Sequence, residues 1–181
     1  VIQQKLRTVT ESTELYRQQM GKALASSASL DPEDAARLAY SSKGTYYTKS
    51  DREDGGAAVF YSGFVPVQEA ERQKVSKVLT MQFLMKDLCN SHSLVSSIYL
   101  NTFDSLNVIY PYFDVLSQYP TLMNIPTYNF YYEADAKHNP EKKAKWTDAY
   151  LDPAGHGRMA SSIAPIYNGN FLEGVVGIDV T

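Results

Sequence analysis

The sequence predicts an α+β fold in which one long helix packs alongside an antiparallel sheet. The first 28 residues have the apolar spacing of a single helix, and two later stretches, 93–113 and 158–181, each read as a pair of strands joined by a short turn. The chain has 181 residues, of which 44% are hydrophobic and 20% are charged. It is therefore long enough and apolar enough to bury one sizeable core.

The N-terminal helix is expected over residues 1–28. Its seam residues follow the alternating spacing of four and three that is typical of a heptad repeat. They are Ile2, Leu6, Val9, Thr13, Tyr16, Met20 and Ala23. The seam fits two interpretations that the sequence leaves open. The helix either lies on its own domain, or it pairs with its twin in a homodimer or leads in from a membrane span.

Residues 31–65 are expected to hold a short helix and a hairpin. Asp31 and Pro32 have the pattern of a helix N-cap followed by the first helical residue. A polar turn at residues 51–56 separates two short strand-like runs. The role of this segment in the domain is left open.

A second long helix is expected over residues 66–90. Its apolar stripe comprises Val75, Val78, Leu79, Met81, Met85 and Leu88. The remaining elements are strands at 93–102, 106–113, 158–167 and 171–181, irregular chain or short helices at 114–127, and a polar loop at 136–157. Residues 129–135 are expected to be extended or to lead into a short helix, and on an extended segment Tyr131 and Tyr132 would face opposite sides.

Composition excludes several classes of function. The net charge is −3 and no basic run is present, so we expect no nucleic-acid partner. No apolar run is long enough for a transmembrane helix, and no signal peptide is recognisable. The chain begins at Val1, and we expect it to be a piece of a longer protein. Its one cysteine, Cys89, can form no internal disulfide.

Catalytic and cofactor motifs are absent from the sequence, so we expect no enzyme activity, no cofactor and no metal. Cys89 and His92 are close in sequence, which raises the hypothesis of a small hydrolase, but nothing nearby supplies an oxyanion hole. Asp148, Asp152 and His156 match no metal-ligand spacing, and turn capping is the interpretation we favour for the two carboxylates.

Five short motifs follow one another between residues 139 and 181. They read NP, WTxxYxD, GxGxMxS, PxY and GVVGIDVT. In this order they resemble the Cache sensor domains, also called PDC domains, which are PAS-like extracytoplasmic sensors. The resemblance covers residues 90–181, and the long N-terminal helix extends it. It implies three parts: a helix at 1–30 leading from the membrane, an unassigned segment at 31–65, and a PAS-like lobe at 66–181.

The resemblance also implies a function. Domains of this family form the extracytoplasmic sensory part of histidine kinases, chemoreceptors and diguanylate cyclases. We therefore expect a membrane-anchored parent protein, a small-molecule ligand, a signal that passes through the N-terminal helix, and a homodimer formed through that helix. The alternative is a ligand-free structural or dimerisation lobe of the same kind of receptor.

The last strand carries a carboxylate that needs a partner. Asp179 lies between Ile178 and Val180, and a buried carboxylate must be satisfied either by the protein or by a ligand. In the amino-acid-binding branch of the family, the matching Asp takes the ligand ammonium, and a Tyr 29 residues earlier contributes to the pocket. Tyr150 occupies that position here. Trp146 and Asp148 lie beside it and complete this part of the expected ligand-binding set.

The same branch uses an Arg-x-Trp-Tyr cluster, and the nearest segment here is NFYY. It puts Asn129 in the Arg position and Tyr131 in the Trp position, and it keeps Tyr132. Asn cannot replace the charge that a guanidinium offers to a carboxylate. An amine without a carboxylate is therefore favoured as ligand. An amino acid or organic acid would need a cation from elsewhere, such as Arg158 or Lys145.

Overall fold

A computed structural model describes residues 1–181, and it confirms the α+β prediction. All strand pairs of the sheet are antiparallel, and the strand order is β1-β2-β3-β5-β4-β9-β8-β6, with β7 paired to β8 off this path. The strands are β1 (Leu38–Tyr40), β2 (Tyr46–Thr48), β3 (Ala58–Tyr61), β4 (Val95–Thr102), β5 (Leu106–Tyr110), β6 (Lys145–Trp146), β7 (Tyr150–Leu151), β8 (Arg158–Asn168) and β9 (Phe171–Val180).

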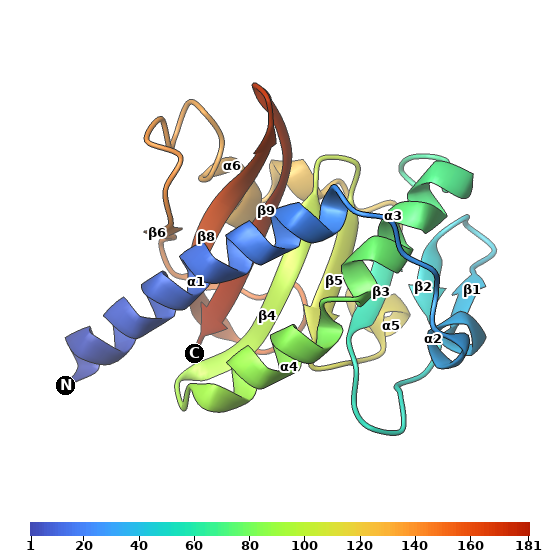
Figure 1. Cartoon of the computed structure of the whole chain (residues 1–181), viewed down its shortest axis with the longest axis horizontal. Coiled ribbons are helices and arrows are strands. Elements are labelled where there is room, and N and C mark those ends of the chain that lie inside the picture. The colour runs from blue at the N-terminus through green and yellow to red at the C-terminus, as the bar shows by residue number, and fades with distance from the viewer.

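Helices cover both faces of this sheet (Figure 1). They are α1 (Ile2–Leu24), α2 (Pro32–Arg37), α3 (Glu69–Leu79), α4 (Gln82–Ser91), α5 (Val115–Gln118), α6 (Asn129–Tyr132) and the 3₁₀ turn η1 (Ile125–Thr127). The longer helices α1, α3 and α4 lie on one face, which holds the larger hydrophobic core. The short helices α5 and α6 lie on the other face over a smaller, more aromatic core.

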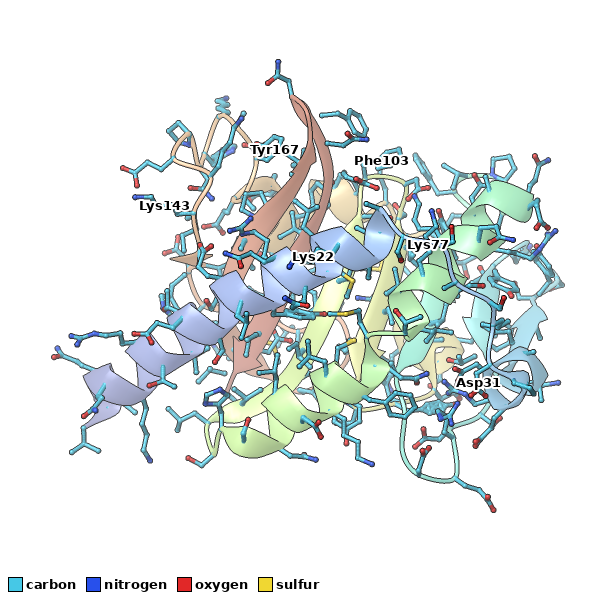
Figure 2. All side chains as sticks on the ribbon, in the orientation of Figure 1. Lys22, Asp31, Lys77, Phe103, Lys143 and Tyr167 are labelled. Atoms are coloured by element: carbon cyan, nitrogen blue, oxygen red, sulfur yellow. The ribbon has the colours of Figure 1, made fainter.

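The long helix α1 crosses β8 and β9 diagonally (Figure 1). Five of the seven seam residues are buried against the chain's own sheet, namely Val9, Thr13, Tyr16, Met20 and Ala23. Ile2, in contrast, remains 57% exposed. The seam therefore serves the helix's own domain from Val9 onward. At its other end, Lys77 of α3 donates a hydrogen bond to the carbonyl of Leu24 (3.4 Å; Figure 2).

The single helix expected over residues 66–90 is wrong, because the structure has two helices there. The hydroxyl of Thr80 donates to the Lys77 carbonyl (2.6 Å) and competes with the helical ladder. The amide of Met81 then donates to the Val78 carbonyl, three residues back instead of four (2.9 Å). The chain turns at this point, and α4 starts in a new direction (Figure 1).

Residues 31–65 join the edge of the main sheet. Asp31 caps α2 as expected, since its carboxylate accepts from the amide of Glu33 (2.8 Å). The expected hairpin is also present: β2 pairs with β3, with Tyr46 opposite Tyr61. Because β3 pairs in turn with β5, this segment is continuous with the sheet formed by the later residues.

A buried polar network fixes this segment to α4. Gln82 is 1% exposed; it donates to Asp34 (2.8 Å) and accepts from the amide of Ala57 (3.1 Å). Arg37, also buried, donates to the same Asp34 carboxylate (3.0 Å), which a second guanidinium, Arg52, approaches to 3.1 Å. These hydrogen bonds fix the position of Gln82 at the start of α4. We infer that a continuous helix over residues 66–90 would not place Gln82 against these partners.

None of the helices combines the length with the apolar composition that crossing a bilayer requires.

We expect Gln82→Met to lower the free energy of unfolding by about 2–4 kcal/mol, because it leaves the Ala57 amide and one Asp34 oxygen buried without a partner. Urea denaturation would measure the change. The matched control is Gln73→Met on exposed α3 surface, where the change should stay within about 0.5 kcal/mol. Equal effects of the two substitutions would show that the network contributes nothing.

Candidate functional site

A small cavity lies on the aromatic face of the sheet, under the short helices. Its floor carries Tyr99, Asn101, Asn107 and Asp179 from the central strands. Its cover includes Phe130 of α6 and the chain around β7. The cavity volume is about 20 Å³, and one water needs about 10–15 Å³ on this measure. The closed site therefore has room for one water or one group of similar size, such as an ammonium.

Strand register places Asp179 at the centre of the floor. It lies on β9 directly opposite Ser97 of β4 on one side and Ser161 of β8 on the other. Residues on a strand alternate between faces, so Tyr99 and Asn101 follow Ser97 along the same face of β4. The result is a row of polar side chains on strands that are otherwise apolar.

Both flanking serines donate to the Asp179 carboxylate, Ser97 at 2.6 Å and Ser161 at 2.5 Å. Asp179 is 2% exposed, and burial raises its pKa to about 6, although the serine hydrogen bonds oppose this shift. The carboxylate of Asp152 raises the pKa further. The hydrogen bonds from the two serines thus compensate the buried negative charge of Asp179 only in part.

Tyr150 connects the cover to the floor. Its hydroxyl lies 2.5 Å from the Ser161 hydroxyl and 3.4 Å from Asp179. Its ring centroid is 5.4 Å from that of Phe130, so two aromatic rings form one wall. Burial raises the pKa of Tyr150, and the Asp179 charge adds to this effect, so the phenol stays neutral.

The loop between β7 and β8 closes the cavity and carries a second carboxylate. Asp152 accepts from the amide of Ala154 (2.9 Å) and from the ring of His156 (2.7 Å). Gly155 has φ +89°, and a Cβ there would come within 2.7 Å of Gln118 on α5. The loop is therefore folded tightly onto α5, with Asp152 on the cavity side. The turn role expected for Asp152 is confirmed by these backbone contacts.

The far end of the cavity floor is a chain of neutral polar groups. Tyr119 donates to Asn107 (2.9 Å), and Asn107 donates to Asn101 (2.8 Å). Among the residues that line the cavity there is no Lys or Arg. The cavity combines two carboxylates, neutral polar groups and aromatic rings, which favours a cationic occupant.

Two of the seven expected ligand-binding residues, Tyr150 and Asp179, lie in the cavity wall. Trp146 lies on the opposite face, where its ring N–H donates to Thr10 of α1 (3.1 Å). Asp148 is exposed in the chain between β6 and β7. These two positions lie outside the cavity.

The three NFYY residues expected to bind the ligand also lie outside the cavity, because the segment forms the helical turn α6 and not an extended strand. Asn129 donates to Glu133 one turn later (3.2 Å). Tyr131 is buried under the sheet face, and Tyr132 is 39% exposed with its ring against His138. Phe130, which directly precedes Tyr131, is the residue of this segment that reaches the cavity.

Neither cation proposed for a carboxylate ligand reaches the cavity. Arg158 is exposed at the start of β8, and Lys145 donates to the carbonyl of His138 (3.4 Å). Cys89 and His92 do not form a catalytic pair. Burial raises the pKa of the Cys89 thiol, and the His92 ring is hydrogen-bonded to Ser12 of α1 (3.0 Å).

Five polar cavity residues are missing from the expected ligand-binding set: Tyr99, Asn101, Asn107, Tyr119 and Asp152. A signal for the first two is present in the run SSIYLNT. Polar residues there recur at every second position, so one face of the strand is polar. On a buried strand, a polar face indicates a binding site on that side of the sheet. The contribution of Tyr119 depends on its contact with Asn107 in the folded chain, which the spacing of residues in the sequence does not reveal.

Comparison with known proteins yields solved structures only. No protein-family model matches the chain, and no curated protein matches it. Two solved structures of the ligand-binding domain of the Pseudomonas aeruginosa PAO1 amino acid chemoreceptor PctB, in complex with L-Gln and with L-Arg, are similar to it. Each is 24% identical, with a TM-score of 0.45 over 56% of this chain. The match spans 38% and 37% of the PctB chains, less than two-fifths of their length.

We expect Asp179→Asn to reveal the cost of the buried charge. Because the folded-state pKa of about 6 lies above the ordinary value of 3.8, folding takes up a proton between these values. The stabilisation that comes from this proton is complete below about pH 4 and is lost as the pH rises through about 6. The free energy of unfolding of Asp179→Asn, minus that of wild type, should therefore grow by about 2–3 kcal/mol between about pH 4 and about pH 7.

Urea denaturation at several pH values measures this difference. Asp135→Asn is a control of opposite sign. Burial of Asp135 is slight, and hydrogen bonds from His138 outweigh it and lower the pKa of that carboxyl. The stability contributed by Asp135 is lost as the pH falls. A difference between Asp179→Asn and wild type that does not change with pH would contradict a raised pKa.

Proposed function

We propose that this chain is the extracytoplasmic ligand-sensing domain of a transmembrane receptor, and that its ligand is a small organic amine. The observation that carries the proposal is the Asp179 carboxylate, which is buried in a cavity with no Lys or Arg in its wall. The order of the motifs in residues 139–181, which resembles that of Cache sensors, supports the receptor part of the proposal.

The chemistry of the cavity favours an ammonium group over a carboxylate. A cation placed beside Asp179 would compensate the charge whose burial raises the pKa of that residue. The rings of Phe130 and Tyr150 add an aromatic wall that attracts cations. A carboxylate would instead meet Asp152 and Asp179 with no guanidinium to balance them.

We propose that the cover moves when a ligand enters. The cavity of about 20 Å³ fits the head group of an amine but not its tail. The β7–β8 loop and the residues near Tyr119 and Phe130 form the cover, so an open state must move at least part of them. A ligand that binds the open state more tightly than the closed state would shift the balance between the two.

Strand β8 offers a route from the cavity to α1. Ser161 holds Asp179 on one face, and the next residue, Ser162, faces the opposite side and bonds Thr13 of α1 (2.7 Å). Trp146 pairs with Ser162 across β6 and β8 and bonds Thr10 of the same helix. A shift of β8 at the ligand would thus act directly on α1, which we propose leads towards the membrane in a membrane-anchored parent protein.

The exposed start of α1 is our candidate for a homodimer contact, because Ile2 there is free of the chain's own core. A second candidate function is a structural or dimerisation lobe that binds no ligand. The small volume of the closed cavity favours this alternative.

We expect a primary amine to raise the melting temperature of the domain. A thermal-shift screen would compare ethanolamine, putrescine, agmatine and tyramine with L-Gln, L-Arg and succinate. An amine present at a hundredfold excess over its dissociation constant stabilises by about 2.7 kcal/mol, or a few degrees at this chain length. Asp179→Asn should abolish the shift, and the exposed-surface control Asp87→Asn should keep it.

The affinity for the amine should also decrease when the pH is lowered below about 6, because Asp179 then takes up a proton. A folded domain that responds to none of these compounds would favour the structural lobe.

We expect amine binding to change the fluorescence of Trp146, the only tryptophan of the chain. Trp146 lies on the α1 face, away from the cavity, so direct contact with the ligand cannot cause the change. The double variant Thr13→Val, Ser162→Ala removes the β8–α1 hydrogen bond and should weaken the fluorescence change while the thermal shift persists. A thermal shift with constant emission in wild type would argue against a relay through α1.

A further inference from the structure

The hydroxyl of Tyr99 is buried in the cavity wall without a hydrogen-bond partner. Tyr99 is 3% exposed, and its ring forms part of the cavity floor. It lies on the same face of β4 as Ser97 and Asn101. The other hydroxyls of this row and of the cover are paired. A buried hydroxyl without a partner is costly, so its presence in a ligand cavity needs an explanation.

Gly177 is the residue that allows Tyr99 to occupy this place. It lies directly opposite Tyr99 across β4 and β9. A Cβ at position 177 would come within 2.1 Å of the Tyr99 Cζ atom and within 2.3 Å of its hydroxyl oxygen. The ring thus lies flat over the backbone of β9, close enough to Asp179 and Tyr150 for both to raise its pKa further above the value that burial sets.

Three groups in the cavity still have oxygen lone pairs free to accept hydrogen bonds. They are the Tyr150 hydroxyl, the Asp179 carboxylate and the Tyr99 hydroxyl. Ser161 has one proton, which it donates to Asp179 at 2.5 Å, so Tyr150 is the donor in its own 2.5 Å contact with Ser161. The Tyr150 oxygen then keeps its lone pairs. The Asp179 carboxylate has about four acceptor sites and uses two of them, for Ser97 and Ser161. The Tyr99 hydroxyl makes no direct hydrogen bond, although the Ser161 and Tyr150 hydroxyls lie near enough to influence its pKa.

We propose that Tyr99 is a specificity-determining residue that supplies the third acceptor for a primary ammonium group, and that Gly177 positions it. This inference rests on the proposed function and narrows the ligand class. A primary ammonium has three N–H donors, which match Asp179, Tyr150 and Tyr99, and its size matches the closed cavity of about 20 Å³. An N,N-dimethyl ammonium has one N–H donor, so it can use only one of the three acceptors.

The test uses matched pairs of amines and titration calorimetry. The pairs are tyramine with N,N-dimethyltyramine, and ethanolamine with N,N-dimethylethanolamine. Wild type should bind the primary member of a pair at least about tenfold more tightly. Tyr99→Phe should weaken the primary amine about tenfold and leave the dimethyl amine nearly unchanged, so that the preference disappears.

The matched control is Tyr16→Phe. Tyr16 is also buried with an unpartnered hydroxyl, but it belongs to α1 and packs on the opposite face of the sheet. Both variants should melt at or above the wild-type temperature, because each removes an unsatisfied buried group. Only Tyr99→Phe should change the preference between the two amines. Gly177→Ala should reproduce the loss of preference, and it should add nothing when combined with Tyr99→Phe.

The outcomes separate this inference from the proposed function. If wild type binds no amine of either kind, the proposed function fails and this inference fails with it. If wild type binds amines but Tyr99→Phe keeps the preference for the primary member, only the role of Tyr99 is overturned. A melting temperature of Tyr99→Phe well below wild type would assign the hydroxyl a structural role instead.

Discussion

The rest of the site depends on one constraint, a carboxylate buried near the C-terminal end of strand β9. Asp179 lies on β9 between two neighbouring strands, and each of these strands places a serine opposite it. Two neutral hydroxyl groups satisfy the geometry of the carboxylate but not its charge, which is why burial still raises its pKa. The cover of the cavity, its aromatic wall and its second carboxylate all surround this uncompensated charge.

Successive side chains on a β-strand point to opposite faces, and the two faces of this sheet have different roles. Ser161 faces the aromatic side and holds Asp179, whereas Ser162 faces the helical side and holds Thr13. The helical face carries the larger apolar core under α1, α3 and α4, and so contributes most of the buried apolar area. The aromatic face is covered by single turns and loops, whose smaller buried area makes them the easier part to displace.

The sequence predicts the strands and the hairpins, because strand alternation and turn residues are local signals. The pair Tyr150–Asp179 is instead expected from the resemblance to Cache sensors. The position of Trp146 is not local. It faces α1 because β6 sets it opposite Ser162, and a shift of one residue would have turned it towards the cavity. The break between α3 and α4 depends on the buried partners of Gln82, which lie about 25 to 48 residues away in the chain. Tyr131 and Tyr132 lie on a helical turn, so the alternation expected for a strand does not apply to them.

If Asp179 binds an ammonium group as we propose, its pKa of about 6 has a consequence for the signal of the domain. Below that pH the protonated Asp179 must give up its proton before it can pair with an ammonium, so proton and amine compete for the same carboxylate. Occupancy would then follow the ratio of amine to proton concentration and not the amine concentration alone. In a mildly acidic environment the same amount of amine would give a weaker signal, and the receptor would respond to alkalinisation as it responds to added ligand.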